Sequence, residues 1–522
     1  MKEKQVLFQI DRVQGTNGNP EIYREAEKLN EATSSLWQKT THYESFYTKS
    51  AKELPLKASV VIIGGGMAGV LTAYQLKRRG IDAIVLERDE IGRTCTAHTT
   101  AKITSLHGII YQKIAKTYGK EKARQYYQSQ QQAIQDYKDV IEECHIDCDF
   151  ESKSHVMYTV DHRDKLAMEY ECVKELGIPA EWIDSSPLPF RIQGGIVFPN
   201  QAQFHPLKFL DQLVERLQVF THCQATRIDS DGTVEVNHHY EVKAESVVIA
   251  THYPIINSKG FYFTRLDQER SYVLALSQPD GFDIHNMYID ENEKGHSFRP
   301  YKDMLIMGLG NHRSGKKNLP DYYKQLEGEA LKWFPDAKIE YHWSNQDCMS
   351  VDQIPYIGVY SKKLPNFYVA TGFYQWGMSN SMVSANVISD LIATGKSRYE
   401  ELYSPSRHQW SGLGSFIENG AISVVHLTKQ LIHMKNDEIS QIKQGDAGIV
   451  KLDGQVVGVY KDEENQLHVV DTKCPHLGCQ LAWNPNEKTW DCPCHGSRFD
   501  IDGHLIEDPA QKDLDRACCT KK

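Results

Sequence analysis

The stretch SVVIIGGGMAGVLTAYQLKRRGIDAIVLERD, residues 59–89, decides the fold of the larger part of this chain. An apolar run leads into a glycine-rich turn, and a second apolar run closes the stretch. This order predicts a buried strand, a tight turn, a helix and a second strand. Gly64, Gly66 and Gly69 form the pattern G-x-G-x-x-G, and Glu87 ends the second strand 18 residues after Gly69.

The chemistry of this turn suits an anionic ligand. Its glycines let the backbone approach a pyrophosphate, and the helix that follows offers its N-terminal amides to the same anion. A carboxylate placed like Glu87 can accept hydrogen bonds from ribose hydroxyls. The unit therefore predicts a dinucleotide site, whereas a tight turn without a ligand leaves the acid unexplained. Its expected cofactor contacts are Gly64, Gly66, Met67, Ala68, Gly69, Glu87 and Arg88.

Two later stretches bear on which dinucleotide binds, because the loop alone fits both FAD and NAD. VVIATHYP (247–254) reads as a strand ending in small residues, as when a chain returns beneath a bound adenosine. YVATGFYQWGMSNS (368–381) places Gly372, Gly377 and Met378 at another strand-to-helix turn. This turn offers a second set of helix N-terminal amides to the cofactor.

With these pieces, and with DQIPYIG (352–358), residues 58–395 resemble the D-amino-acid oxidase-like FAD oxidoreductases, which include sarcosine and glycine oxidases. The resemblance implies FAD as cofactor, with the late turn at the pyrimidine edge of the flavin. HTTAKIT (98–104) would then pass the isoalloxazine, with Thr99, Thr100 and Lys102 nearest. A cation at Lys102 could stabilise reduced, anionic flavin, although a solvated surface lysine is the alternative.

The β-rich segments between the flavin pieces predict an antiparallel-sheet substrate domain, about 150–195 and 257–344. Arg299, His312 and Arg313 are candidates to pair with a substrate carboxylate, and structural roles are open for each. Cys348 is a candidate for covalent attachment of the flavin, as in some members of this group. A buried thiol is the alternative.

Near the C-terminal end, CPHLGC (474–479) is followed by CPCHGS (492–497). These loops give the pattern C-x-H…C-x-x-H through Cys474, His476, Cys492 and His495. Two thiolates and two imidazoles fit a Rieske [2Fe-2S] cluster, in which the histidines bind one iron. The same four side chains could also hold a tetrahedral zinc ion.

The loops resemble Rieske domains of the cytochrome bc kind, which favours the cluster over zinc. Leu477-Gly478 and Gly496-Ser497 match that kind, and the resemblance implies a disulfide between Cys479 and Cys494. It also implies that the two histidines lie at an exposed tip, where electrons would leave. Phe499 stands where the respiratory proteins carry a tyrosine. One hydrogen-bond donor fewer predicts a potential below the top of the Rieske range.

Bulk composition narrows the partners and the compartment. The chain has 522 residues, a net charge of −10 and a pI near 6.1, which disfavours nucleic acid as a partner. No uninterrupted run of eighteen apolar residues occurs, so no transmembrane segment is expected. The N-terminal residues lack the apolar core of a signal peptide. Twelve cysteines, six of them scattered, favour a cytoplasmic protein with a metal site.

The expected fold class is α/β plus β. A Rossmann-type FAD-binding domain with an interleaved antiparallel-sheet substrate domain precedes a small all-β Rieske domain. The expected boundaries are an N-terminal extension over 1–57, the FAD-dependent oxidoreductase over 58–395, a linker over 396–440 and the Rieske domain over 441–515. Cys518 and Cys519 are expected in an exposed end.

The whole pattern resembles Bacillus-type fusions of such an FAD domain with a Rieske iron-sulfur domain. It predicts oxidation of a small amine or amino acid, with electrons passing from flavin through the cluster. The acceptor would be a one-electron acceptor protein or a quinone-like carrier. Two alternatives stay open. In one, a carrier or NAD(P)H feeds the cluster and the flavin reduces an acceptor. In the other, the chain is a non-catalytic electron carrier or redox sensor.

Overall fold

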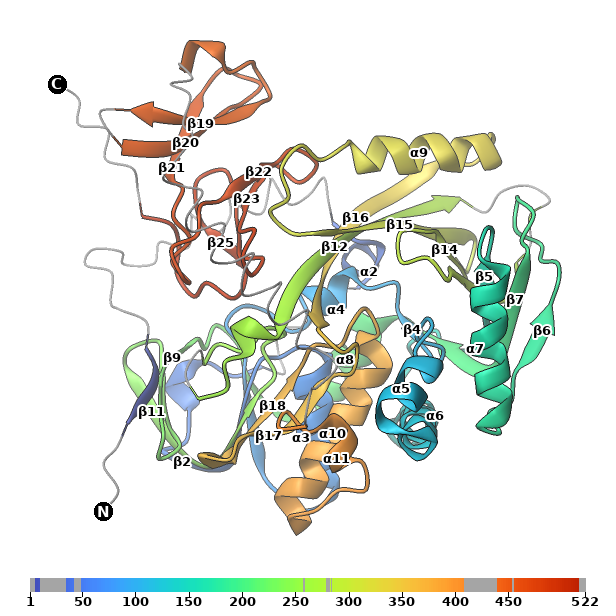
Figure 1. Ribbon diagram of the computed structural model, residues 1–522. Helices are drawn as coiled ribbons and strands as arrows, with labels where there is room; N and C mark the ends of the chain where they lie inside the picture. Colours follow the sequence, from blue (N-terminus) through green and yellow to red (C-terminus); the bar gives the residue numbers. More distant parts are fainter. Residues whose placement is uncertain are drawn as a thin grey trace.

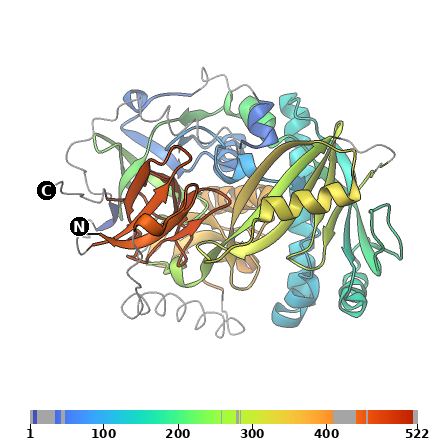
Figure 2. The same ribbon diagram turned by 90° about the horizontal axis from the view of Figure 1, so that it is seen from above.

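A computed structural model describes residues 5–9, 34–41, 48–256, 259–277, 282, 284–407, 439–452 and 455–515. Figure 1 shows the small C-terminal β domain, in red and orange, above the nucleotide-binding part and beside a second large sheet. Viewed from above in Figure 2, it lies at one end of that sheet, near the N-terminal end of helix α9 (Tyr322–Trp333).

The first sheet has nine strands and contains the glycine-loop unit. Strand β2 (Lys57–Ile63) leads through the glycine turn into helix α3 (Met67–Arg78), and β3 (Ala83–Leu86) pairs with β2 in parallel. Buried valines and isoleucines fill the central strands, as expected where both faces of a parallel sheet are covered. The remaining strands are β1 (Val6–Gln9), β8 (Gln218–Phe220), β9 (Ala225–Asp229), β10 (Thr233–Val236), β11 (Tyr240–Ile249), β17 (Tyr356–Ser361) and β18 (Leu364–Thr371).

Helices cover this sheet and join it to the second one. Helix α10 (Gly377–Thr394) packs beside α3, and the long α6 (Lys120–Cys144) packs against α10. Helix α10 begins at Gly377, so the predicted strand-to-helix turn within 368–381 is confirmed. The other helices are α2 (Leu36–Lys39), α4 (Cys95–His98), α5 (Tyr111–Tyr118), α7 (Arg163–Glu175), α8 (Pro206–Val214) and α11 (Glu400–Tyr403), with single 3₁₀ turns at Ala51–Glu53, Tyr262–Thr264 and Ile439–Gln441.

The second sheet, called here the substrate sheet, runs β16-β12-β15-β14-β13-β5-β7-β4, with β6 beside β7. Its pairing is antiparallel except between β13 and β5, which are parallel. The prediction of an antiparallel sheet thus fails at this one junction, where two separate chain segments meet. The strands are β4 (Lys102–Ile103), β5 (Glu151–Thr159), β6 (Glu181–Ile183), β7 (Gly194–Gln203), β12 (Leu266–Ser277), β13 (Met287–Asp290), β14 (Ser297–Tyr301), β15 (Met304–Arg313) and β16 (Ile339–Ser350).

The C-terminal domain consists of two small antiparallel sheets, of three and four strands. Trp490 and Phe499 are cross-strand partners in its core and are fully buried. The first sheet contains β19 (Ala447–Leu452), β20 (Gln455–Lys461) and β21 (Leu467–Asp471). The second contains β22 (Ala482–Asn484), β23 (Thr489–Asp491), β24 (Arg498–Phe499) and β25 (Leu505–Glu507).

Parts of the expected extension and linker lie outside the described residues. Of the first 57 residues, the structure describes a short strand, one helical turn and a 3₁₀ turn. Residues 408–438 of the expected linker, and Cys518 and Cys519, also lie outside. Within the described chain, no helix is both long enough and apolar enough to cross a membrane.

Candidate redox sites

The glycine turn has the close packing that its sequence predicts. Gly64 has φ of +110°, and a Cβ on Gly69 would lie 2.0 Å from the Gly64 carbonyl oxygen. Only glycine fits this contact between strand and helix. The Glu87 carboxylate accepts hydrogen bonds from the amides of Gly65 (2.7 Å) and Asp89 (2.8 Å), which fixes its position beside the turn.

The turn opens into a cavity with about 1360 Å³ of atom-free space, part of it open to solvent. The amides at the start of α3 begin at its wall, where they can meet an anion. The residues predicted for the cofactor that line it are Gly64, Gly66, Met67, Ala68, Glu87, Arg88, Thr99, Gly372, Gly377 and Met378. Gly69 does not line the cavity but packs against Gly64 in the turn. Thr100 does not line it either, and its carbonyl accepts a hydrogen bond from Arg299.

The structure does not place Arg299 for binding a substrate, which corrects that prediction. Its fully buried guanidinium donates to the carbonyls of Thr100, Ala101 and Phe204 and to the Gln203 side chain. These acceptors take four of its five N–H donors inside its own domain.

Lys102, the other catalytic candidate, is buried at the end of the substrate sheet. Burial, together with the neighbouring Arg299 charge, lowers the pKa of Lys102 to about 7. The surface alternative for this lysine is therefore wrong, and its proximity to flavin stays a prediction.

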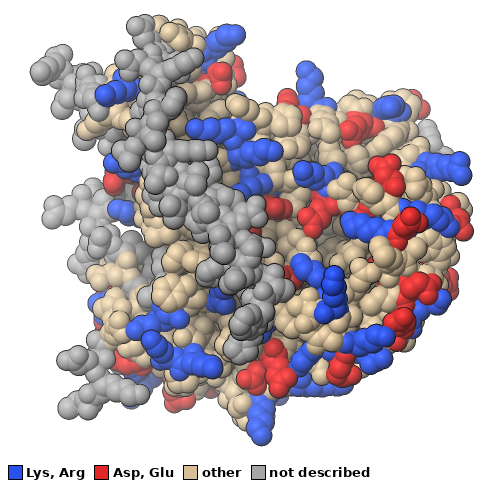
Figure 3. All heavy atoms as spheres, in the orientation of Figure 1, with Lys and Arg blue, Asp and Glu red and all other residues tan. Residues whose placement is uncertain are grey.

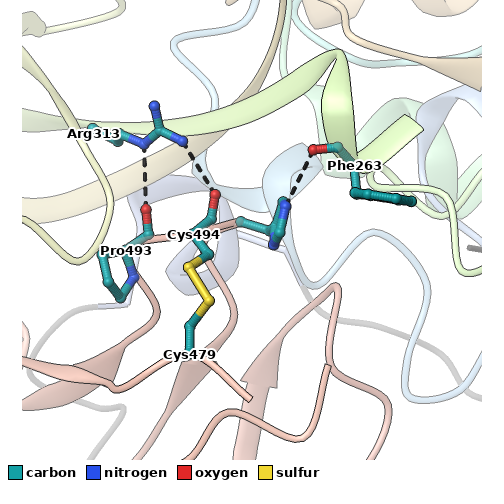
Figure 4. The surroundings of a disulfide bond; sticks show 6 residues. Phe263, Arg313, Cys479, Pro493 and Cys494 are labelled. Carbon is teal, nitrogen blue, oxygen red and sulfur yellow. Dashed lines mark hydrogen bonds between the residues drawn. A yellow bond between two sulfur atoms is a disulfide. The ribbon is translucent and has the colours of Figure 1, made fainter. Parts of the chain in front are cut away.

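The remaining substrate candidates also have structural contacts. His312 stacks on Tyr322 and lies 3.1 Å from the Tyr272 hydroxyl. Arg313 donates to the backbone carbonyls of Pro493 and Cys494, at 3.3 and 3.2 Å. Figure 4 shows this arginine reaching the second cysteine loop from the substrate sheet.

Cys348 does reach the flavin cavity. Its side chain is buried in the cavity wall, and its sulfur lies 3.6 Å from the Thr371 hydroxyl. Burial raises the pKa of Cys348 to about 12, so the group is a neutral thiol here. This agrees with the alternative of a buried thiol and leaves covalent attachment without support.

The four predicted cluster ligands lie in two facing loops. Cys474 and Cys492 are buried, and the rings of His476 and His495 are 4.9 Å apart. A hydrogen bond with Cys492 lowers the pKa of Cys474 to about 7, with further help from Ser497. Burial lowers the pKa of both histidines, to about 3 for His476 and about 4 for His495. A thiol with a lowered pKa and neutral imidazoles are suited to bind metal, which takes thiolate and uncharged imidazole as ligands.

The orientation of His495 fits an iron ligand. Its Nε2 lies 3.1 Å from the Phe263 carbonyl oxygen, which can only accept, so Nε2 carries the proton. Nδ1 then holds a lone pair, and it is buried without a hydrogen-bond partner among the described residues. A buried nitrogen without a partner, on the loop that also carries Cys492, fits an imidazole ligand of a metal cluster.

A disulfide joins Cys479 and Cys494, as the resemblance implies. The sulfurs of Cys479, Cys492 and Cys494 lie within 4.8 Å of one another. Two of these three are consumed by the disulfide, so Cys492 is the one left to bind iron. The Ser497 hydroxyl accepts from the Ala510 amide at 2.9 Å, which leaves its own proton for a sulfur.

The expectation that both histidines form an exposed tip is wrong for His495. This residue is 2% exposed, because the flavin-binding part covers it through Phe263. His476 is partly exposed, and the adjacent Leu477 is 42% exposed. Tyr253 lies between the two domains, with its ring 6.2 Å from each histidine ring.

The C-terminal domain also forms part of the flavin cavity, which no sequence motif signalled. Glu507, Asp508 and Gln511 line it together with the glycine turn. Asp508 forms a 3.0 Å ion pair with Arg88, the residue directly after Glu87, which is predicted to bind the ribose. The other lining residues that sequence reasoning missed include Thr94, Cys95, Gln268, Asn345, Gln346 and Asp347.

Comparison with known proteins defines the class. Residues 59–391 match the family described as FAD dependent oxidoreductase, and residues 433–517 match the Rieske [2Fe-2S] domain. The chain belongs to the FAD dependent oxidoreductase family and carries a Rieske domain. It is an oxidoreductase that binds FAD in the first part and a [2Fe-2S] cluster in the second.

Particular relatives agree with both parts. The Bacillus subtilis protein YhfW, which has the name of a Rieske 2Fe-2S iron-sulfur protein, is 35% identical over 504 residues, 93% of this chain and 97% of that one. The cytochrome b6-f complex iron-sulfur subunit 1 of Synechocystis is 42% identical over 62 residues, 12% of this chain and 30% of that one. Glycine oxidase from Geobacillus kaustophilus shares the fold, with a TM-score of 0.57 and 17% identity over 68% of this chain and all of that one.

Proposed function

We propose that this protein oxidises a small amine or amino acid at FAD and passes the electrons through the Rieske cluster to an external acceptor. One observation carries the proposal: the second ligand loop of the cluster, residues 492–497, is docked on the domain that forms the flavin cavity. When bound, the flavin accepts a hydride and the cluster accepts single electrons. The docking gives the flavin a one-electron outlet within the same chain.

The residues of this chain hold and orient the two cofactors. The glycine turn and α3 bind the pyrophosphate, while Arg88 and Asp508 close the nucleotide end of the cavity. We retain Cys474, His476, Cys492 and His495 as ligands of the cluster, and Lys102 as a cation near the flavin. Because His495 faces inward, His476 and the exposed Leu477 form the side that an external one-electron acceptor would meet.

The surface and the thiols bear on partners and compartment. Figure 3 shows Lys and Arg side chains interspersed with Asp and Glu on the face it draws, which does not favour nucleic acid. Cys95, Cys144, Cys148, Cys172 and Cys223 are free thiols, which supports a reducing, cytoplasmic environment.

Anaerobic mixing with a panel of amines and amino acids tests the proposal. We expect one substrate class to bleach the flavin absorbance first, with the EPR signal of the reduced cluster appearing afterwards. A cluster that is reduced before the flavin, with NAD(P)H or a carrier as donor, would reverse the direction. Failure of every small molecule to reduce the flavin would favour an electron carrier without catalysis.

A further inference from the structure

Two buried carboxamides stand between the flavin cavity and the cluster. Gln268 on β12 and Gln346 on β16 are 2% and 1% exposed, and both line the cavity. The Gln346 Nε2 donates to the Gln268 Oε1 at 2.9 Å, so the two side chains form one unit. It is called here the glutamine pair.

The glutamine pair is hydrogen-bonded to the loop that carries two cluster ligands. Gln268 Nε2 donates to the carbonyl of His495 at 2.7 Å and to that of Asp508 at 2.9 Å. Gln346 Nε2 donates to the carbonyl of Gly496 at 2.9 Å. Gly496 has φ of +82°, and a Cβ there would lie 2.7 Å from the Gln268 Cβ. The loop backbone therefore packs directly on the pair.

The orientation of both amides is fixed by their neighbours. Gln346 Oε1 accepts from Arg270 at 2.9 Å and from the Ser314 hydroxyl at 2.6 Å, so its NH₂ group must face the Gly496 and Gln268 oxygens. Gln268 Oε1 accepts from Gln346, which turns its own NH₂ group toward the loop. Both amide groups of the pair therefore have their donors and acceptors engaged, which holds the two side chains in one orientation.

We propose that the glutamine pair is the positioning element that couples the flavin cavity to the Rieske cluster and sets the rate of electron transfer between them. This inference rests on the proposed function. Both glutamines touch the cavity on one side and the ligand loop on the other, so they fix the separation of the two cofactors. Arg313 also holds the loop, but it does not line the cavity.

The transfer balances as two single steps. Reduced flavin carries two electrons, and the oxidised cluster accepts one. An external one-electron acceptor must take that electron before the second leaves the flavin. The proton released by the flavin goes to solvent, and no bond forms between protein and cofactor.

Comparison of Gln268→Leu with Arg313→Met in the full-length holoprotein tests the inference. Both variants remove donors to the loop, whereas only the first removes a side chain from the cavity wall. The flavin is reduced by light with EDTA under anaerobic conditions, and cluster reduction is followed by rapid-freeze EPR. We expect Gln268→Leu to slow cluster reduction about tenfold, since it leaves buried carbonyls unpaired and disfavours the docked geometry. Arg313→Met should cause a smaller loss.

Three further measurements separate coupling from damage. Dithionite should reduce the same amount of cluster in each variant, and the rate is expressed per bound flavin because Gln268 lines the cavity. Hydrogen exchange at the amides of Cys494, His495 and Gly496 should rise in both variants. Gln268→Asn, which keeps the amide group but shortens its reach, should recover part of the rate.

Equal losses in Gln268→Leu and Arg313→Met would overturn the role of the glutamine pair, because general docking would then explain both. No loss in Gln268→Leu would also overturn it. If the wild-type flavin never reduces the cluster, the proposed function itself fails. The two failures are therefore distinguishable in one experiment.

Discussion

Two groups of strands in the substrate sheet use their polar side chains differently. In the first group, β4, β7 and β14 carry polar groups such as Arg299 and Gln203, whose hydrogen bonds are satisfied within the flavin-binding part. In the second group, β12, β15 and β16 carry Gln268, Arg313 and Gln346, which bond to the Rieske domain. The border between the groups lies between the paired strands β14 and β15, so one sheet stabilises its own domain on one side of this border and contacts the Rieske domain on the other.

The largest expected effect on stability is at Arg299, in the first group of strands. Arg299→Met leaves several buried carbonyls without a donor, so we expect a loss of about 4 kcal/mol in the free energy of unfolding. Urea unfolding of the holoprotein measures it. Arg313→Met is the matched variant in the second group of strands. It should lower the free energy of unfolding clearly less, because the Arg313 guanidinium is partly exposed. Equal losses of unfolding free energy in the two variants would contradict the difference between the two groups of strands.

Lys102, on β4 in the first group of strands, should make the stability of the protein depend on pH. The pKa of Lys102 is about 7 in the folded chain, below its ordinary value of 10.5, so the unfolded chain binds more protons between these values. Its contribution to stability should therefore rise with pH across this window, by roughly 3 kcal/mol from pH 7 to 9.5. Lys102→Met should lack this rise in urea unfolding at the two pH values. An unchanged pH profile in the variant would contradict a buried lysine.

Glu507 tests the contact between the second group of strands and the Rieske domain, because it pairs with Arg270 on β12. Burial alone would raise the pKa of Glu507, but Arg498 and Arg270 lower it to about 2. Its contribution is therefore complete above pH 4.5 and is lost as pH falls through 2. We expect Glu507→Gln to destabilise the protein by about 2 kcal/mol at pH 7. The measurement is thermal unfolding at pH 7 and pH 3, where the gap between variant and wild type should narrow at the lower pH. A gap that stays constant would contradict the ion pairs.

The smallest effect is expected on the reduction potential of the cluster, through Phe499. Phe499 is fully buried in the core of the Rieske domain. Phe499→Tyr adds a hydroxyl that can donate toward a ligand sulfur, so the reduction potential should rise. EPR-monitored redox titration measures the shift. A potential that does not move would show that the added hydroxyl does not reach the cluster.

Local sequence was enough to predict the elements that depend on neighbouring residues. The Gly64-to-Glu87 unit and the four Cys and His ligands each lie in short segments whose spacing reflects one turn or loop. The roles of Arg299 and Arg313 could not be predicted, because equal side chains on adjacent strands face different partners. Gln268, Gln346 and Asp508 belong to no motif, and their roles appear only when the two domains are packed together.

The contribution of Glu507, Asp508 and Gln511 to the flavin cavity has a consequence for biogenesis. During synthesis the glycine turn leaves the ribosome long before these three residues do. A nascent chain can therefore meet FAD while the crevice is still open on one side. Arrival of the iron-sulfur module then adds the last part of the cavity wall.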